Sequence, residues 1–175
     1  MTQFLLFASL PWQKLSFLPR AFPQSYHPQS RGRPPVDADA IIALTSVSDA
    51  NHEKAKRILQ TLSTHQAAAL FPTTAICEAV TVLRGRLNSP DDANSVINKL
   101  QSGDFPLQAV DQAILSEASR LFQPHASKKN TLFDAVVATI AKRLDATAIF
   151  SFDEWYKKQG FTLTSDLLKE IEKVA

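Results

Sequence analysis

The chain has 175 residues, of which 45% are hydrophobic and 21% charged; this mix excludes a wholly disordered chain, and the length is too short for two ordinary domains. The formal net charge of +2 comes from the opening, because residues 1–35 hold four of the 19 basic side chains and none of the 17 acidic ones. Residues 36–175 are therefore slightly acidic, which excludes a basic nucleic-acid-binding module.

Residues 1–35 differ from the rest of the chain in composition as well as in charge. They contain six of the ten prolines and show no sustained helical or strand periodicity. This pattern predicts a Pro-rich, disordered preface, or a mis-assigned translation start, ahead of one domain at 36–175.

The single cysteine, Cys77, excludes an internal disulfide framework and a multi-cysteine zinc site, and it indicates a reducing, cytoplasmic setting. No apolar run reaches the roughly 20 residues needed to cross a bilayer, so we expect no membrane association. The apolar stretch 4–10 has no preceding positive charge, and Pro11 and Trp12 follow it where a small-residue cleavage site belongs. A secretory signal is therefore not expected.

From Val36 onward, short apolar runs alternate with helical patterns. Asp37 lies at the position of the first strand, and an apolar run follows at 40–44. Further short buried strands are predicted at 67–71, 107–110, 148–152 and 161–163. Helices are predicted to begin near Asp49 or Asn51, Thr74, Ser89, Asp111 and Thr131, with a closing helix at 166–174. This alternation predicts an α/β fold in three layers, α/β/α, with a central, mainly parallel sheet.

Four carboxylates fall near the carboxyl ends of the predicted strands, where ligand sites form in parallel sheets: Asp37, Glu78, Asp134 and Asp153. Glu78 lies in an otherwise apolar stretch, where a carboxylate must be paired, protonated or bound to a cation. Clustered carboxylates repel one another unless a divalent cation neutralises them, and oxygen-only ligand sets suit Mg²⁺ or Mn²⁺. Such ions promote phosphodiester hydrolysis, so the pattern indicates a metal-dependent nuclease.

Five segments follow one another along the domain: VDADAIIAL at 36–44, DANHEKA at 49–55, TAICEAVTVL at 74–83, LFDAVVA at 132–138 and SFD at 151–153. In this order they resemble the PIN-domain family, and residues 36 to about 164 resemble its VapC-type toxin ribonucleases. The resemblance implies that Asp37, Glu78, Asp134 and Asp153 form a catalytic, metal-binding quartet for Mg²⁺ or Mn²⁺. It also implies an endoribonuclease that cleaves single-stranded or loop RNA by metal-activated water, a cognate antitoxin partner and a homodimer.

The chain departs from the family pattern at its first strand and at Asp39. Arg33, Pro34 and Pro35 stand where several apolar residues are expected, and since proline removes ladder donors this predicts a truncated strand. Asp39 stands where a neutral polar residue is commoner; it is either an additional metal ligand, directly or through water, or a residue that raises the charge of the site.

The remaining polar candidates have weaker signals. Ser151 is a candidate for orienting a ligand or water, or is an ordinary strand-end hydroxyl. Four basic side chains either contact RNA phosphates or are simply solvated: Lys128, Lys129, Arg84 and Arg86. Three of the four histidines, His52, His65 and His125, are interpreted as surface or helix-terminal residues, and Cys77 as a small buried hydrophobe.

Two alternative functions compete with the nuclease. One is a non-catalytic PIN-like module that binds a protein or RNA. The other is a phosphatase of the haloacid-dehalogenase type, since Asp37-Ala38-Asp39 resembles its Asp-x-Asp motif. That second alternative leaves Glu78 and Asp134 without roles.

Overall fold

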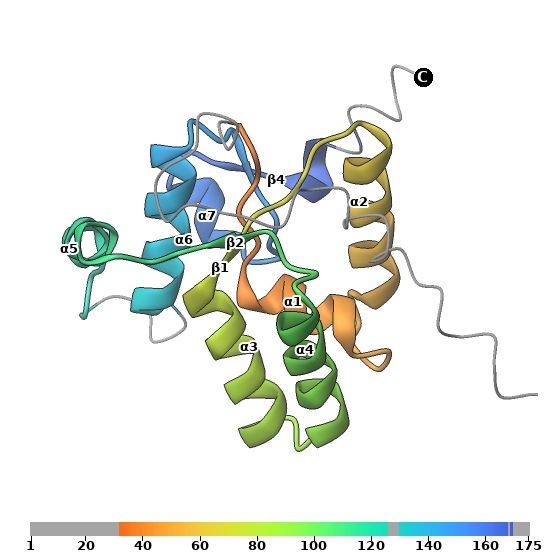
Figure 1. Ribbon diagram of the computed structural model, residues 1–175. Helices are drawn as coiled ribbons and strands as arrows, with labels where there is room; N and C mark the ends of the chain where they lie inside the picture. Colours follow the sequence, from red (N-terminus) through yellow and green to blue (C-terminus); the bar gives the residue numbers. More distant parts are fainter. Residues whose placement is uncertain (1–31, 126–129, 168, 170–175) are drawn as a thin grey trace, which may run out of the picture.

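The computed structural model describes residues 32–125, 130–167 and 169 (Figure 1). The described elements follow one another as α1 (Ala38–Thr45), α2 (His52–Thr64), β1 (Phe71–Pro72), α3 (Thr73–Gly85), α4 (Pro90–Ser102), β2 (Leu107–Gln108), α5 (Gln112–Leu121), α6 (Leu132–Arg143), β3 (Ala148–Ile149), α7 (Trp155–Lys158) and β4 (Thr162–Leu163). None of the helices in these ranges is long and apolar enough to span a membrane.

The strands run parallel to one another. β1 pairs with β2, and β3 pairs with β4. Two isolated parallel bridges, Pro35 with Leu70 and Val36 with Phe150, place the segment 35–36 between these two pairs. The spatial order is therefore β2, β1, segment 35–36, β3, β4, which confirms the predicted parallel arrangement in an α/β fold.

The segment that precedes Asp37 is short because of its prolines. Leu70 N donates to Pro34 O at 3.0 Å and Phe150 N donates to Pro35 O at 2.9 Å, so each proline contributes a carbonyl to the sheet. Neither proline has a backbone N–H, so neither can donate a hydrogen bond to a neighbouring strand. Asp37 N, the next donor on this side, reaches Phe150 O at 3.0 Å. Residues 32–35 thus belong to the folded unit, which extends a few residues ahead of the expected boundary at 36.

We expect a chain that begins at Gly32 to unfold cooperatively with the same free energy as the full chain. A chain that begins at Val36 lacks the two proline carbonyls that Leu70 and Phe150 use, and its free energy of unfolding should fall by about 2 kcal/mol or more. Three apolar residues placed before Val36 should restore most of that loss, since they resupply the carbonyls. Urea unfolding of the three chains checks this, and equal midpoints for the Gly32 and Val36 chains would contradict it.

Helices lie on both sides of the strands: in Figure 1, α2 lies on one side and α5, α6 and α7 lie on the other. The apolar run 40–44 forms most of α1, where Ala40 to Leu44 are all buried. In α6, every residue from Ala135 to Ala141 is buried. Residues 164–167 begin the predicted closing helix, whose remainder, apart from Lys169, lies outside the described residues.

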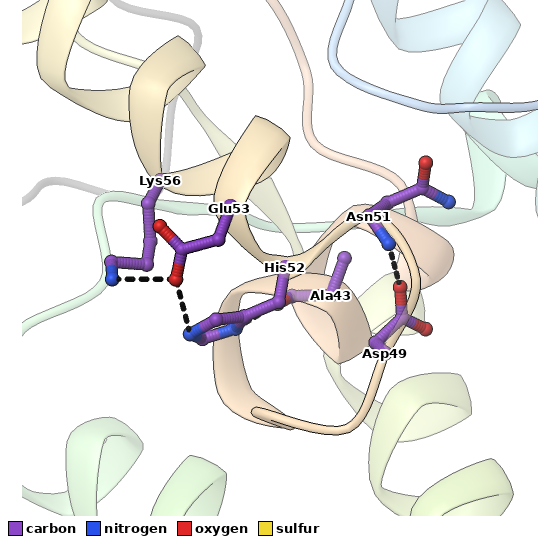
Figure 2. Close-up of polar contacts among 6 residues, drawn as sticks. All are labelled: Ala43, Asp49, Asn51, His52, Glu53 and Lys56. Atoms are coloured by element: carbon purple, nitrogen blue, oxygen red, sulfur yellow. Dashed lines mark hydrogen bonds and ion pairs between the residues drawn. The ribbon is translucent and has the colours of Figure 1, made fainter.

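His52 is buried rather than on the surface, which corrects part of the sequence-based interpretation (Figure 2). Its Nδ1 donates to Ala43 O at 2.7 Å, so a hydrogen bond links the first residue of α2 to α1. In the connecting turn, Asp49 Oδ1 accepts from Asn51 N at 2.7 Å. His52 is therefore a structural hydrogen-bond donor, a role that its spacing along the sequence does not reveal.

Candidate active site

Asp37 lies where segment 35–36 of the sheet ends and α1 begins. Its Oδ1 accepts from Ala38 N at 2.7 Å as the N-cap of α1, and its Oδ2 accepts from Ser151 Oγ at 3.1 Å. The side chain is buried. Burial raises the pKa of Asp37 well above its usual range, and the charges of Asp39 and Asp134 raise that pKa further.

Ser151 joins two carboxylates to the end of β3. Its hydroxyl lies 3.1 Å from Asp37 Oδ2 and 3.0 Å from Asp39 Oδ2, and it accepts from Asp153 N at 3.1 Å. Asp39 Oδ2 also accepts from Phe152 N at 2.8 Å. Burial raises the pKa of Asp39 to about 6 despite these donors. Asp39 Oδ1 is buried and has no hydrogen-bond partner among the described residues, which leaves one carboxylate oxygen of the cluster unsatisfied there.

Asp134 and Asp153 are each held by a nearby backbone N–H. Asp134 completes a capping box at the start of α6, where it accepts from Thr131 N. Asp153 Oδ1 accepts from Trp155 N at 2.8 Å. Burial raises the pKa of Asp134, and the charge of Asp153 adds to the shift. Each carboxylate has two oxygens with several lone pairs, so these contacts leave acceptor capacity for a cation.

Glu78 lies in the second turn of α3, the helix that follows β1. Partial burial raises its pKa to about 7, with further contributions from the charges of Asp134 and Asp39. Arg86, at the C-cap of α3, acts in the opposite direction. Glu78 is therefore a partly desolvated carboxylate beside other carboxylates, as its apolar sequence context predicts.

The structure brings all four candidate carboxylates, together with Asp39, to one region at the carboxyl ends of the strands. Asp134 lies close enough to Asp37 and Glu78 to raise their pKa values, and its own pKa is raised by Asp153. As they lie, no three Asp, Glu, His or Cys side chains of the described residues are grouped closely enough to hold one metal ion. The donors nevertheless fit a hard divalent cation, because they are all carboxylates, they repel one another, and one buried oxygen lacks a partner within the described part of the chain.

Tyr156 is a neighbour of the cluster that sequence reasoning missed. The side chain is fully buried, and its hydroxyl has no hydrogen bond of standard geometry within the described chain. Burial raises the Tyr156 pKa well above its usual value, and so do the charges of Asp37 and Asp134. The only signal in the sequence is its place three residues after Asp153, almost one helical turn on.

The other candidates are exposed on α3 or lie outside the described residues. Arg84 and Arg86 are exposed at the end of α3. Lys128 and Lys129 lie outside the described residues. Cys77 is exposed, which corrects its interpretation as a buried hydrophobe: the apolar face of α3 that packs on the core carries Ala75, Ile76, Ala79 and Leu83.

We expect Ser151→Ala to lower the free energy of unfolding by about 1–3 kcal/mol, because it removes a buried donor from two carboxylates. Ser95→Ala is the matched control, since the exposed Ser95 hydroxyl only bonds back to Asp91 O in its own helix. Denaturant unfolding of both variants checks this. A Ser151→Ala protein as stable as Ser95→Ala would show that the hydroxyl does not hold the carboxylates.

Comparison with known proteins identifies the family of the chain. The PIN domain matches residues 36–161, so the chain belongs to the PIN-domain family. This membership replaces the haloacid-dehalogenase interpretation of Asp37 and Asp39. Among solved structures, the chain is similar to Mycobacterium tuberculosis VapC20, a sarcin-ricin loop cleaving toxin, with a TM-score of 0.63 and 19% sequence identity over 73% of this chain and 95% of that one. No curated protein matches the sequence.

Proposed function

We propose that this protein is a divalent-metal-dependent endoribonuclease that cleaves single-stranded or loop RNA. The observation that carries the proposal is the convergence of Asp37, Glu78, Asp134 and Asp153 from four separate segments on one edge of a parallel sheet. Membership in the PIN-domain family supports a nuclease, and the similarity in fold to a toxin that cleaves RNA supports RNA as the substrate. A non-catalytic binding module has no need of mutually repelling, partly desolvated carboxylates.

The quartet, with Asp39 as an additional ligand, would hold Mg²⁺ or Mn²⁺. The bound ion would neutralise the carboxylates, acidify water and offset negative charge on the phosphoryl group. Ser151 would keep Asp37 and Asp39 in place through its shared hydroxyl. Tyr156, fully buried behind the cluster, would exclude water from that side. Arg84, Arg86, Lys128 and Lys129 would contact RNA phosphates.

We include a cognate antitoxin and a homodimer in this proposal, with action in the cytoplasm as the toxin of a toxin-antitoxin pair. Large apolar side chains on α5 and at the start of α6 are about 40% exposed and offer a surface for a partner: Leu115, Leu132 and Phe133. Light scattering that shows only a monomer at micromolar concentration would contradict the homodimer.

The test is cleavage of a labelled single-stranded RNA by the purified full chain. We expect endonucleolytic products with Mn²⁺ or Mg²⁺, no cleavage in EDTA, and recovery when excess Mn²⁺ is added. Cleavage that persists in chelator would contradict the metal dependence. Metal-dependent binding without cleavage of any RNA would favour the non-catalytic module.

A further inference from the structure

Tyr156 carries a hydroxyl at a position where packing alone requires only a ring. The side chain is fully buried, and its ring packs edge-on against Trp155, with centroids 5.2 Å apart and planes at 70°. The hydroxyl makes no hydrogen bond of standard geometry with the described residues. Burying a hydroxyl without a partner costs free energy, and a buried tyrosine usually has one. The hydroxyl of Tyr156 therefore calls for a role beyond packing.

The backbone of α7 holds Tyr156 beside the carboxylate cluster. Tyr156 N donates to Asp153 O at 3.4 Å, and Trp155 N donates to Asp153 Oδ1 at 2.8 Å. On its other side, Tyr156 O accepts from Phe161 N at 3.1 Å, just before β4. α7 is thus linked both to a member of the quartet and to the sheet, which gives the buried ring a fixed place next to the candidate site.

The hydroxyl of Tyr156 faces carboxylates. The charges of Asp37, Asp134 and Asp39 all raise the Tyr156 pKa, so all three lie near this side chain. The hydroxyl in turn lowers the pKa of Asp37, as a hydrogen-bond donor does, although the two groups are not in standard geometry. Asp37 is therefore the acceptor that this donor can reach.

Asp37 has the capacity to accept this donor and a cation together. A carboxylate offers about four lone-pair sites. Its Oδ1 accepts from Ala38 N at 2.7 Å, and its Oδ2 accepts from Ser151 Oγ at 3.1 Å. The remaining sites suffice for one hydroxyl and one metal ion. Hydrogen bonds to a ligating carboxylate fix its orientation and so strengthen metal binding.

We propose that Tyr156 is a positioning residue whose hydroxyl donates to Asp37 when a divalent cation occupies the cluster, and thereby holds this carboxylate toward the ion. The inference rests on the proposed metal-dependent function and assigns a use to the buried hydroxyl. Ser151 would hold Asp37 from the end of β3, and Tyr156 would hold it from α7. Without the ion, the hydroxyl contributes nothing to the stability of the fold.

The first test is the affinity of the full chain for Mn²⁺, measured by calorimetry. Tyr156→Phe removes the hydroxyl and keeps the ring. Loss of a hydrogen bond to a metal ligand lowers metal affinity by about 10–100-fold, so the Kd should rise by about that factor. Thr139→Val is the matched control, because it removes the hydroxyl of another buried residue, more than one helical turn beyond Asp134 in α6. Its Kd should equal that of the wild type.

The outcomes of this test separate the proposal from the function on which it rests. A wild-type Kd in Tyr156→Phe would overturn the role of the hydroxyl and leave the metal site intact. Equal losses of affinity in Tyr156→Phe and Thr139→Val would also overturn it, because any buried hydroxyl would then have the same effect. A wild-type chain that binds no Mn²⁺ would overturn the proposed metal site and this inference together.

The second test separates positioning from packing by urea unfolding with and without metal. In EDTA, Tyr156→Phe should be at least as stable as the wild type, because it removes a buried hydroxyl that lacks a partner. At a fixed Mn²⁺ concentration above the wild-type Kd, the wild type should be the more stable of the two, because it binds the ion more tightly. A Tyr156→Phe protein that is less stable than the wild type by the same amount in both conditions would show that the hydroxyl serves only the fold, and would overturn the proposal.

A spectroscopic measurement reports on the hydroxyl itself. The chain has two tyrosines, Tyr26 and Tyr156, so a full-length Tyr26→Phe protein labelled with ¹³C at tyrosine Cζ gives a single resonance. Because Cζ carries the hydroxyl, this resonance should shift saturably when diamagnetic Mg²⁺ is added. A resonance that stays in place while calorimetry shows Mg²⁺ bound would overturn the proposal.

Discussion

Asp134→Asn should lower the rate of RNA cleavage by at least about 100-fold while leaving α6 folded. Substitution of a residue that only hydrogen-bonds to a metal ligand lowers metal affinity or activity by about 10–100-fold. Replacing a ligand itself should lower activity by at least as much. The amide oxygen of asparagine can still accept from Thr131 N, and the capping box should therefore largely survive. Single-turnover cleavage with saturating Mn²⁺, together with circular dichroism, measures both consequences.

Asp92→Asn is the matched control for this variant. Asp92 occupies the same position in α4 that Asp134 occupies in α6, three residues after the N-cap, where its Oδ2 accepts from Ser89 Oγ at 2.8 Å. Asp92 does not belong to the carboxylate cluster, so its substitution should leave cleavage unchanged. Comparable losses in both variants would mean that helix capping, and not metal binding, explains the effect of Asp134→Asn.

The metal-free protein should become less stable as the pH rises from about 4 to about 8. Burial raises the pKa of Asp39 from 3.8 to about 6 and that of Glu78 from 4.5 to about 7. Between the unfolded and folded pKa values, the folded state binds more protons than the unfolded state, so the stability is complete below about pH 4 and is lost as the pH passes the folded values. For Asp39 the loss is at most about 3 kcal/mol, and for the partly exposed Glu78 it is smaller.

Urea unfolding in EDTA at several pH values measures this slope. The Asp39→Asn, Glu78→Gln double variant should reduce this slope, to which Asp37 and Asp134 still contribute, and should be more stable than the wild type at pH 8. Asp91→Asn, on the exposed first turn of α4, should leave the slope unchanged. Mn²⁺ at pH 8 should restore wild-type stability, because a cation that binds only the folded, ionised cluster offsets the repulsion. A double variant with the wild-type slope would show that these carboxylates are not desolvated together.

The elements that were predictable from the sequence are those whose signals are local. The Ser89-Pro90 and Thr131-to-Asp134 patterns mark the starts of α4 and α6 where the structure has them, and Asp111 caps α5 through Ile114 N at 2.8 Å. The strands are shorter than predicted, and Pro72 lies inside β1 instead of after it. Strand length depends on which neighbouring backbone groups are available, and prolines on both sides of the central pairing remove donors that a single segment does not reveal.

The candidate carboxylates were accessible to sequence reasoning because each follows a strand or opens a helix, and parallel strands bring such positions to one edge. Contacts between distant segments were not. Ser151 is separated from Asp37 and Asp39 by more than 110 positions. The pairing of Val36 with Phe150 brings them within hydrogen-bond distance, and the sequence alone does not show this pairing. Tyr156 was missed, and the burial of the helix-terminal His52 was not predicted, for the same reason, since a buried side chain is defined by what packs around it.

The central claim is that Asp37, Glu78, Asp134 and Asp153 form one metal site. Its most direct test is the affinity of the full chain for Mn²⁺, measured by calorimetry. Four variants carry one neutral substitution each: Asp37→Asn, Glu78→Gln, Asp134→Asn and Asp153→Asn. We predict saturable binding by the wild type and by Asp92→Asn, and a Kd at least about ten times higher in each of the four variants. A wild-type chain that binds no Mn²⁺, or four variants that bind it with the wild-type Kd, would contradict the claim.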